Sequence, residues 1–263
     1  PHALALHDGA APGLSQLVSE ITSGDVRRVA FVAPERMAWP LPLYEAALMT
    51  AALGRRHHRR LDLILVTAEG AALQPFGEHA TAEMQALLDH DDIALVTRTH
   101  CRIPASDRVL LTSERGDRVG ELAVDRVVAL PELTGPHIRG LPSAPYGFIP
   151  IDSFCRVPGT FDVYAAGDGT NYPVKHGGIA AQQADVAARG IAAAAGADVE
   201  ARPFHPTIHG ILLTGESPRY LTARLIGAHP FGSAVTSADA ATTAASTKVL
   251  APYLAGLLDE VGR

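Results

Sequence analysis

The stretch that decides the fold is residues 26–33, which read VRRVAFVA. After its two arginines this stretch is continuously apolar, as is typical of a strand buried on both faces of a parallel sheet. Two further short apolar runs, residues 61–67 and 93–96, have the same character. We predict a buried strand in each of the three stretches.

Helical patterns alternate with these strands. Apolar residues recur at helical spacing in residues 12–23, and Gly24 follows as a C-cap. Residues 43–53 are rich in Ala and Leu, and residues 78–88 continue the alternation after the second strand. This order predicts an α/β fold with a Rossmann-like, three-layer nucleotide-binding domain.

The pattern changes after residue 107. Residues 108–113 and 118–124 are predicted strands joined by a turn, and residues 125–130 are a third. Three strands without intervening helices predict an antiparallel meander on the first domain. Prolines and glycines then crowd into residues 131–145, which marks a domain boundary.

The second half of the chain has fewer regular patterns. The elements that we predict here are a buried strand at 161–166, an Ala-rich helix from His176-Gly177-Gly178 to about Ala195, a hairpin pair at 208–213 and 220–225, a loop at 233–247 and an amphipathic helix over 250–258.

Composition excludes several classes of protein. Hydrophobic residues make up 47% of the 263 residues and charged residues 19%, so a sizeable core is expected. A net charge of −6 with one short basic cluster, residues 55–60, argues against a nucleic-acid binder. Cys101 and Cys155 form neither a disulfide framework nor a zinc site. No apolar run reaches the roughly 18 residues of a membrane span.

The chemistry concentrates at residues 160–168, TFDVYAAGD. The predicted strand ends in small residues and delivers Asp168 to the edge of the sheet where ligands bind in open α/β folds. A carboxylate there accepts hydrogen bonds from sugar or ribityl hydroxyls. The helix that begins at Gly177 points unsatisfied N–H groups at its surroundings and favours an anionic or electron-rich group.

These residues carry a family resemblance. Residues 163–168, followed by 175–184 (KHGGIAAQQA), resemble the second flavin motif of flavoproteins with two dinucleotide-binding domains. This FAD-dependent pyridine nucleotide–disulfide oxidoreductase superfamily includes the type II NADH dehydrogenases and the sulfide:quinone reductases. The resemblance covers most of the chain from about Arg27 to Leu225.

The resemblance implies a cofactor site. Asp168, after Gly167, would hold the ribityl–phosphate part of FAD, and the backbone of Gly177, Gly178 and Ile179 would face the flavin ring. The cofactor-binding residues expected from it in this half of the chain are Gly167, Asp168, Lys175, His176, Gly177, Gly178, Ile179 and Gln182.

The resemblance also implies a division of the chain. Residues 1–135 would form an NAD(P)H-binding-like domain, 136–200 the C-terminal half of an FAD-binding domain, and 201–263 a β-hairpin and helix interface region. The G-x-G-x-x-G loop of the first FAD half is absent from the sequence. We therefore expect a fragment that begins just before the NAD(P)H domain, with self-association through the exposed face of the FAD domain.

The first domain departs from the usual nucleotide-binding pattern. After residues 26–33 the expected glycine loop is replaced by a proline-rich segment, residues 33–42. Prolines lack the N–H groups that bind a pyrophosphate. Glu69 follows the second strand, where an acid binds the ribose 2′-hydroxyl and favours NADH over NADPH.

Structural roles remain open for these residues. Asp168 could instead be a cap or turn residue, and Glu69 could be an exposed acid at the end of a strand. Lys175 could be a solvated side chain, and His176 could be a residue that begins the helix and serves packing. Trp39 fits packing better than a nicotinamide platform. Cys101 and Cys155 lack the spacing of a redox pair and are expected to be ordinary thiols.

The leading hypothesis is an FAD-dependent oxidoreductase that takes electrons from NADH or NADPH and passes them to a small-molecule acceptor such as a quinone. The expected location is cytoplasmic, or peripheral to the membrane. The alternative is a non-catalytic nucleotide-binding or interaction module. A hydrolase is disfavoured because no G-x-S-x-G nucleophile motif is present.

Overall fold

The computed structural model describes residues 2–7, 9–33, 39–224 and 235–238. The chain divides into two units. The first comprises Pro1–Leu133, Ile211–Leu221 and Val235–Ala240, and the second Thr134–Gly210, Thr222–Ala234 and Ala241–Arg263.

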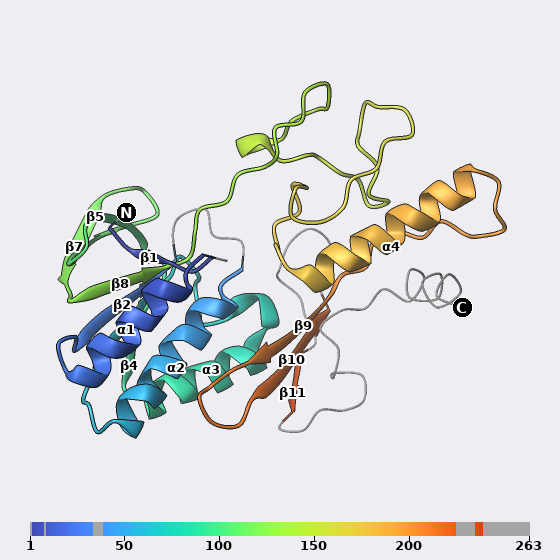
Figure 1. Ribbon diagram of the computed structural model, residues 1–263. Coiled ribbons are helices and arrows are strands. Elements are labelled where there is room, and N and C mark those ends of the chain that lie inside the picture. Colours follow the sequence, from blue (N-terminus) through green and yellow to red (C-terminus); the bar gives the residue numbers. More distant parts are fainter. Residues whose placement is uncertain (1, 8, 34–38, 225–234, 239–263) are drawn as a thin grey trace. The chain divides into compact units, whose positions relative to one another are not determined.

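In chain order the elements (Figure 1) are β1 (Leu4–Ala5), α1 (Ala11–Ser23), β2 (Arg28–Val32), α2 (Leu41–Arg56), β3 (Asp62–Val66), the 3-10 helix η1 (Gln74–Phe76), α3 (Glu78–His90), β4 (Ile93–Val96), β5 (His100–Ala105), β6 (Arg108–Thr112), β7 (Arg118–Ala123), β8 (Arg126–Ala129), the 3-10 helix η2 (Pro145–Gly147), α4 (Gly177–Ala194), β9 (Thr207–Leu212), β10 (Arg219–Arg224) and β11 (Val235–Ala238).

The first unit is built on a parallel sheet of five strands in the order β1-β8-β2-β3-β4. Its central strand β2 pairs in parallel with β3 on one side and with β8 on the other. Four of its five residues are buried, as the uninterrupted apolar run predicted. The three predicted strands at 26–33, 61–67 and 93–96 are confirmed as β2, β3 and β4.

Three helices cover one face of this sheet. Each crossover, from β1 to β2, from β2 to β3 and from β3 to β4, moves along the sheet in the same direction, and such connections are right-handed. The helices α1, α2 and α3 therefore lie on the same face (Figure 1). Gly24 ends α1 with a φ of 92°, which is a left-handed conformation that glycine adopts at little cost. The predicted helices are confirmed, with α2 longer at both ends.

The other face carries an antiparallel meander in the order β5-β6-β7. The prediction of a meander is confirmed, but the choice of its third strand is wrong. Residues 126–129 form β8, which pairs in parallel with β1 and β2. The Asp125 carboxylate just before it accepts the N–H groups of Arg27 and Arg28, both at 2.8 Å, and so holds the start of β8 beside β2.

The third meander strand is β5, an edge strand that the sequence analysis missed. Its hydrophobic pattern is interrupted by Pro104, and its register with β6 shifts between Arg102 and Ala105. Proline is tolerated at such an edge because no ladder hydrogen bond is needed there.

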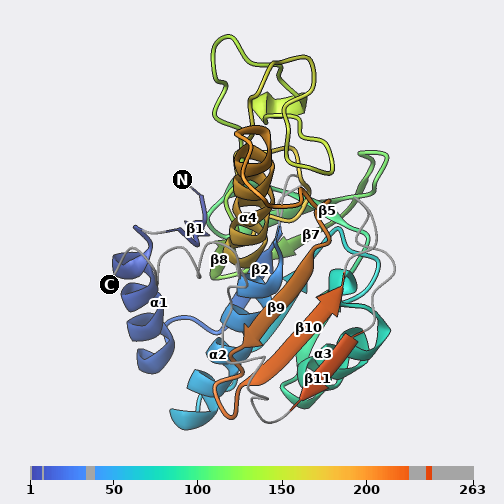
Figure 2. The ribbon, with the colours of Figure 1, turned by 90° about the vertical axis from the view of Figure 1, so that its right-hand side faces the viewer.

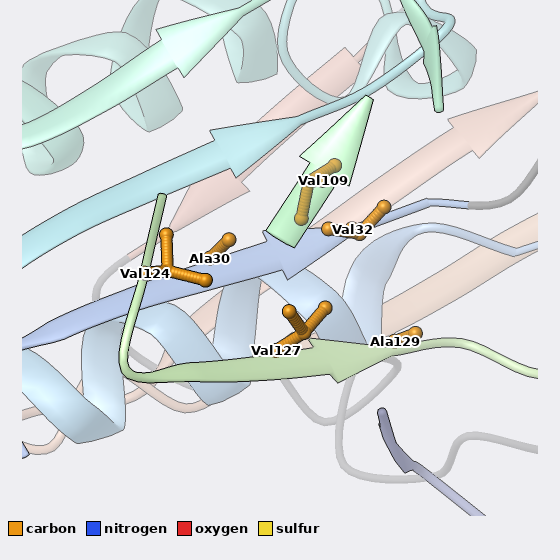
Figure 3. Packing of buried hydrophobic residues seen from close by; sticks show 6 residues of the cluster. All are labelled: Ala30, Val32, Val109, Val124, Val127 and Ala129. Atoms are coloured by element: carbon orange, nitrogen blue, oxygen red, sulfur yellow. The ribbon is translucent and has the colours of Figure 1, made fainter. Parts of the chain in front are cut away.

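A compact apolar cluster joins the meander to the parallel sheet (Figure 3). Val109 of β6 and Val124 lie over Ala30 and Val32 of β2 and over Val127 and Ala129 of β8. Because side chains alternate between the faces of a strand, Phe31 of β2 points to the helical face instead. Successive side chains of β2 therefore pack alternately against the meander on one face and the helices on the other.

The second unit contains α4, which runs from Gly177 to Ala194 as predicted. The predicted buried strand at 161–166 is wrong. This segment folds back on residues 152–157 through a single antiparallel bridge between Arg156 and Tyr164, and Phe161 at its start is 93% exposed. Among the described residues no parallel strand flanks it, so its apolar run has no sheet in which to be buried.

The remaining strands form a three-stranded sheet in the order β11-β10-β9 (Figure 2). The hairpin predicted at 208–213 and 220–225 is confirmed as β9 and β10, with Gly215 in its turn at a φ of 82°. Residues 235–238 form β11, so the loop predicted at 233–247 is wrong for those four residues. The helix predicted over 250–258 lies outside the described residues.

Candidate functional site

The loop at Gly167 and Asp168 is fixed by hydrogen bonds at its glycine. The Gly167 N–H donates to Oε1 of Gln183 on α4 at 2.7 Å, and the Gly167 carbonyl accepts from the Thr170 N–H and hydroxyl at 3.0 and 2.8 Å. Gly167 has a φ of 86°, a conformation that side chains disfavour. Asp168 is exposed beside this anchor, in a loop and not at the end of the buried strand that we had predicted.

The N-terminus of α4 lies next to this loop. A Cβ built on Gly167 would lie 3.5 Å from Cβ of Ala180 in the first turn of α4. The N-cap is His176, whose Nδ1 accepts the Gly178 N–H at 3.2 Å. Gly177 is exposed, and a Cβ on it would meet nothing within 4 Å. Gly178 and Ile179 are buried, so Gly177 is the residue that presents accessible backbone, with the partial positive charge of a helix start.

Lys175 is buried and holds the connection between the loop and the helix. Its ammonium group donates to the carbonyls of Thr170 and Tyr172 and lies 4.1 Å from the centre of the Phe148 ring. Burial lowers the pKa of Lys175 to about 8, against the opposing effect of the negative charge on Asp168. Lys175 is therefore not a solvated side chain, and its donors are used within the protein.

Two glutamines of α4 have different roles. Gln182 holds the start of β9, because its Oε1 accepts the Thr207 N–H at 2.9 Å and its Nε2 donates to the Thr207 carbonyl at 2.7 Å. Gln183 is 1% exposed and holds Gly167, but its Nε2 has no partner among the described residues. A buried amide donor without a partner is costly and marks a place where a bound group can supply an acceptor.

Glu69 lies apart from these residues along the chain, in the first unit, after β3. Its Oε2 accepts hydrogen bonds from the Tyr44 hydroxyl at 2.8 Å and the Thr67 hydroxyl at 3.0 Å, while Oε1 is buried without a partner among the described residues. Burial raises the pKa of Glu69 to about 7, although both hydrogen bonds act to lower it. Glu69 is therefore not an exposed strand-end acid.

The segment before α2 retains its proline-rich character where it is described. Pro40 is the N-cap residue of α2 and Pro42 lies in its first turn. Trp39 packs against Phe76 with ring centres 5.3 Å apart. Residues 34–38 of the predicted proline-rich loop lie outside the described residues.

Cys101 and Cys155 are both free thiols. Burial raises the pKa of both Cys101 and Cys155 to about 12, so both are neutral thiols near pH 7. The part of the chain that the structure describes contains no group of three His, Cys, Asp or Glu side chains that could hold a metal ion. Its helices include none that is both long and apolar enough to cross a membrane.

The structure brings most of the predicted flavin-site residues into one neighbourhood of the second unit, around the Gly167 loop and the first turn of α4. Gln182 points to β9 instead. The sequence analysis missed Gln183 and Phe148. A signal for Gln183 was present, because Ile179, Gln183 and Ala187 recur at helical spacing along the buried face of α4.

Comparison with known proteins gives a similarity of fold. No protein-family model matches the sequence, and no curated protein matches it. Sulfide:quinone oxidoreductase from Aquifex aeolicus superposes with a TM-score of 0.69 at 14% identity, over 88% of this chain and 58% of that one. A chain of the Tetrahymena thermophila mitochondrial ATP synthase structure superposes with a TM-score of 0.61 at 14% identity, over 78% of this chain and 52% of that one. LpdA from Mycobacterium tuberculosis superposes with a TM-score of 0.53 at 14% identity, over 75% of this chain and 40% of that one.

The chain spans about half the length of these solved chains. At 14% identity the likeness concerns the path of the backbone. The protein therefore has the α/β fold with a parallel, Rossmann-like sheet that these structures share.

Proposed function

We propose that this chain supplies the flavin-ring side of an FAD-dependent oxidoreductase. The observation that carries the proposal is the hydrogen bond between Gly167 and Gln183, which ties the exposed Asp168 loop to α4 near its exposed N-terminal residue Gly177. The fold supports the proposal, because sulfide:quinone reductases are among the flavoproteins that the Asp168 motif resembles.

The residues present fit FAD. Asp168 offers an exposed carboxylate for ribityl hydroxyls, and Gly177 leaves its own backbone at the start of α4 accessible to a flat ring. The unpartnered Nε2 of Gln183 lies in the side chain that holds Gly167. FAD, when bound, accepts two electrons from a donor and passes them to an acceptor such as a quinone.

The protein's own contribution is positioning and electrostatics. Asp168 accepts hydrogen bonds and so fixes the cofactor along its chain. The N–H groups of Gly177 and Ile179 precede the first intrahelical hydrogen bond, which Ala180 donates to the His176 carbonyl at 2.9 Å. Both are free of the helix ladder, and that of the exposed Gly177 favours negative charge on a ring placed beside it, whereas Ile179 is buried. Lys175 holds the segment between Asp168 and α4 in place through its hydrogen bonds to the carbonyls of Thr170 and Tyr172.

The residues expected to hold a nicotinamide nucleotide fit it less well. The Glu69 carboxyl is turned onto Tyr44 and Thr67, and its second oxygen is buried, so neither oxygen is presented to a ribose. Pro40 and Pro42 provide no N–H groups for a pyrophosphate. Calorimetric titration with NADH and with NADPH tests whether either nucleotide binds and can serve as the electron donor.

Flavin binding to the protein, purified at its natural length, tests the proposal. We expect the absorbance spectrum of the purified protein to show bound FAD. Asp168→Asn should weaken FAD binding about tenfold, which is equivalent to about 1.4 kcal/mol, because an ionised hydrogen-bond acceptor is lost. Asp162→Asn is the matched control, since Asp162 is an exposed acid of the same segment and Asn tolerates its φ of 51°.

A well-folded protein that neither carries flavin nor binds added FAD would defeat the proposal and favour the non-catalytic nucleotide-binding module. Equal FAD affinity in the wild type and in Asp168→Asn would remove Asp168 from the site.

A further inference from the structure

The helical face of the first unit contains an apolar groove that the proposed function does not use. It lies between α1 and α2, has a volume of about 610 Å³, and reaches down to Phe31 of β2 and Val128 of β8. Its walls include Val18 of α1 and Met49 of α2, which are 46% and 44% exposed. Apolar clefts of this volume are typical of small-molecule sites, whereas isolated exposed apolar residues are not.

The groove extends along both helices. Its lining follows α1 from Ala10 to Ile21, which at 1.5 Å per residue is roughly 16 Å. The lining of α2 runs in the same way from Pro42 to Arg56. A groove with these walls accommodates an extended hydrocarbon chain along its axis.

The charge of the groove is concentrated at one end. Arg56, the last residue of α2, is exposed and is the one permanently charged residue among the described residues of the lining, none of which is acidic. One of its N–H groups donates to the Gly215 carbonyl. A guanidinium group has five N–H donors, so donors remain for an anion.

We propose that this groove binds a free long-chain fatty acid, with the hydrocarbon chain between α1 and α2 and the carboxylate on Arg56. An apolar channel with a single cation at its end is complementary to a molecule that has one apolar chain and one anionic head. A second copy of the protein is a poorer match, because the groove penetrates to the sheet and is not a raised apolar face.

Calorimetric titration with dodecanoate below its critical micelle concentration tests the inference. We expect saturable binding at one site per chain. Arg56→Gln should weaken dodecanoate binding about tenfold. Dodecan-1-ol should bind the wild type about tenfold more weakly than dodecanoate does, and Arg56→Gln should leave the affinity for dodecan-1-ol unchanged. Arg60→Gln is the matched control, since Arg60 belongs to the same basic cluster but does not line the groove.

A second variant keeps the test independent of the contact between Arg56 and Gly215. Met49→Glu places a carboxylate on an exposed wall of the groove and should weaken dodecanoate binding at least tenfold. Val119→Glu is its control, because Val119 is 60% exposed on β7, on the opposite face of the sheet, and should bind as the wild type does.

Three results would overturn the inference: no saturable binding, binding that Met49→Glu leaves unchanged, or equal affinity for dodecanoate and dodecan-1-ol. Concentration-dependent dimerisation that Met49→Glu abolishes, without dodecanoate binding, would instead make the groove an interface between copies.

Discussion

At the scale of single residues, the most unusual environment is that of Glu69. A strand-end acid that the sequence places either at a ribose hydroxyl or in solvent is held by Tyr44 and Thr67, and one of its oxygens is buried without a partner among the described residues. Its pKa of about 7 follows from that burial, and it makes the stability of the first unit depend on pH.

The sign of this dependence follows from linkage. The folded pKa is raised from 4.5 to about 7, so between these values the folded state keeps a proton that the unfolded state has lost. Stability should therefore fall as pH rises from 4.5 to 7, by at most on the order of 3 kcal/mol. Glu69→Gln should flatten this part of the profile, measured as urea midpoints at intervals of pH.

Glu114→Gln is the control for that measurement, because Glu114 is an exposed acid of the turn between β6 and β7. Tyr44→Phe removes a hydrogen bond that lowers the pKa of Glu69 and should move the inflection to higher pH. An unchanged slope in Glu69→Gln would show that another group titrates.

At the scale of elements, the main connection in the second unit is between α4 and the start of β9. Gln182 satisfies both backbone groups of Thr207 and so fixes where the strand begins. We expect Gln182→Ala to cost about 2–3 kcal/mol, since two hydrogen bonds are lost and two backbone groups lose their partners.

Urea unfolding measures this cost, and hydrogen exchange of β9 amides locates it. Gln85→Ala is the matched control, because Gln85 makes an exposed bond to Asp89 one turn away on α3 and should cost less than about 0.5 kcal/mol. Equal losses in the two variants would mean that Gln182 does not anchor β9.

At the scale of the whole molecule, the first unit is assembled from distant parts of the chain. The turn between β9 and β10 belongs to it and contacts α2. The Leu213 N–H donates to Oε1 of Glu45 at 3.0 Å, and Glu216 forms an ion pair with Arg55 at 3.2 Å. Gly215 approaches α2 closely, because a Cβ there would lie 2.3 Å from Cβ of Ala52.

Gly215→Ala tests this long-range contact. Gly116→Ala provides the control, because Gly116 has a similar φ, 84° against 82°, but its Cβ would meet nothing within 4 Å. Both variants carry the strain of a positive φ, of about 1 kcal/mol, and Gly215→Ala should lose about 1–3 kcal/mol more through overpacking against α2. Thermal melts followed by circular dichroism compare the two, and equal losses would show that the turn is not held on α2.

The sequence by itself determined the parallel strands, the helices between them, α4 with its glycine start, and the hairpin, because each depends on a local hydrophobic period and on turn or cap residues. Tertiary structure decided the rest. Residues 127–129 form a short apolar run that fits either sheet, and only the pairing of β8 with β2 placed them in the parallel sheet and not in the meander. Residues 161–166 have the composition of a buried strand but no neighbouring strand among the described residues. Glu69 has Thr67 as a local partner, but its other partner, Tyr44, lies 25 residues away on α2 and meets it only in the folded protein. Pairing partners and burial are properties of contacts between distant residues, which a local pattern does not contain.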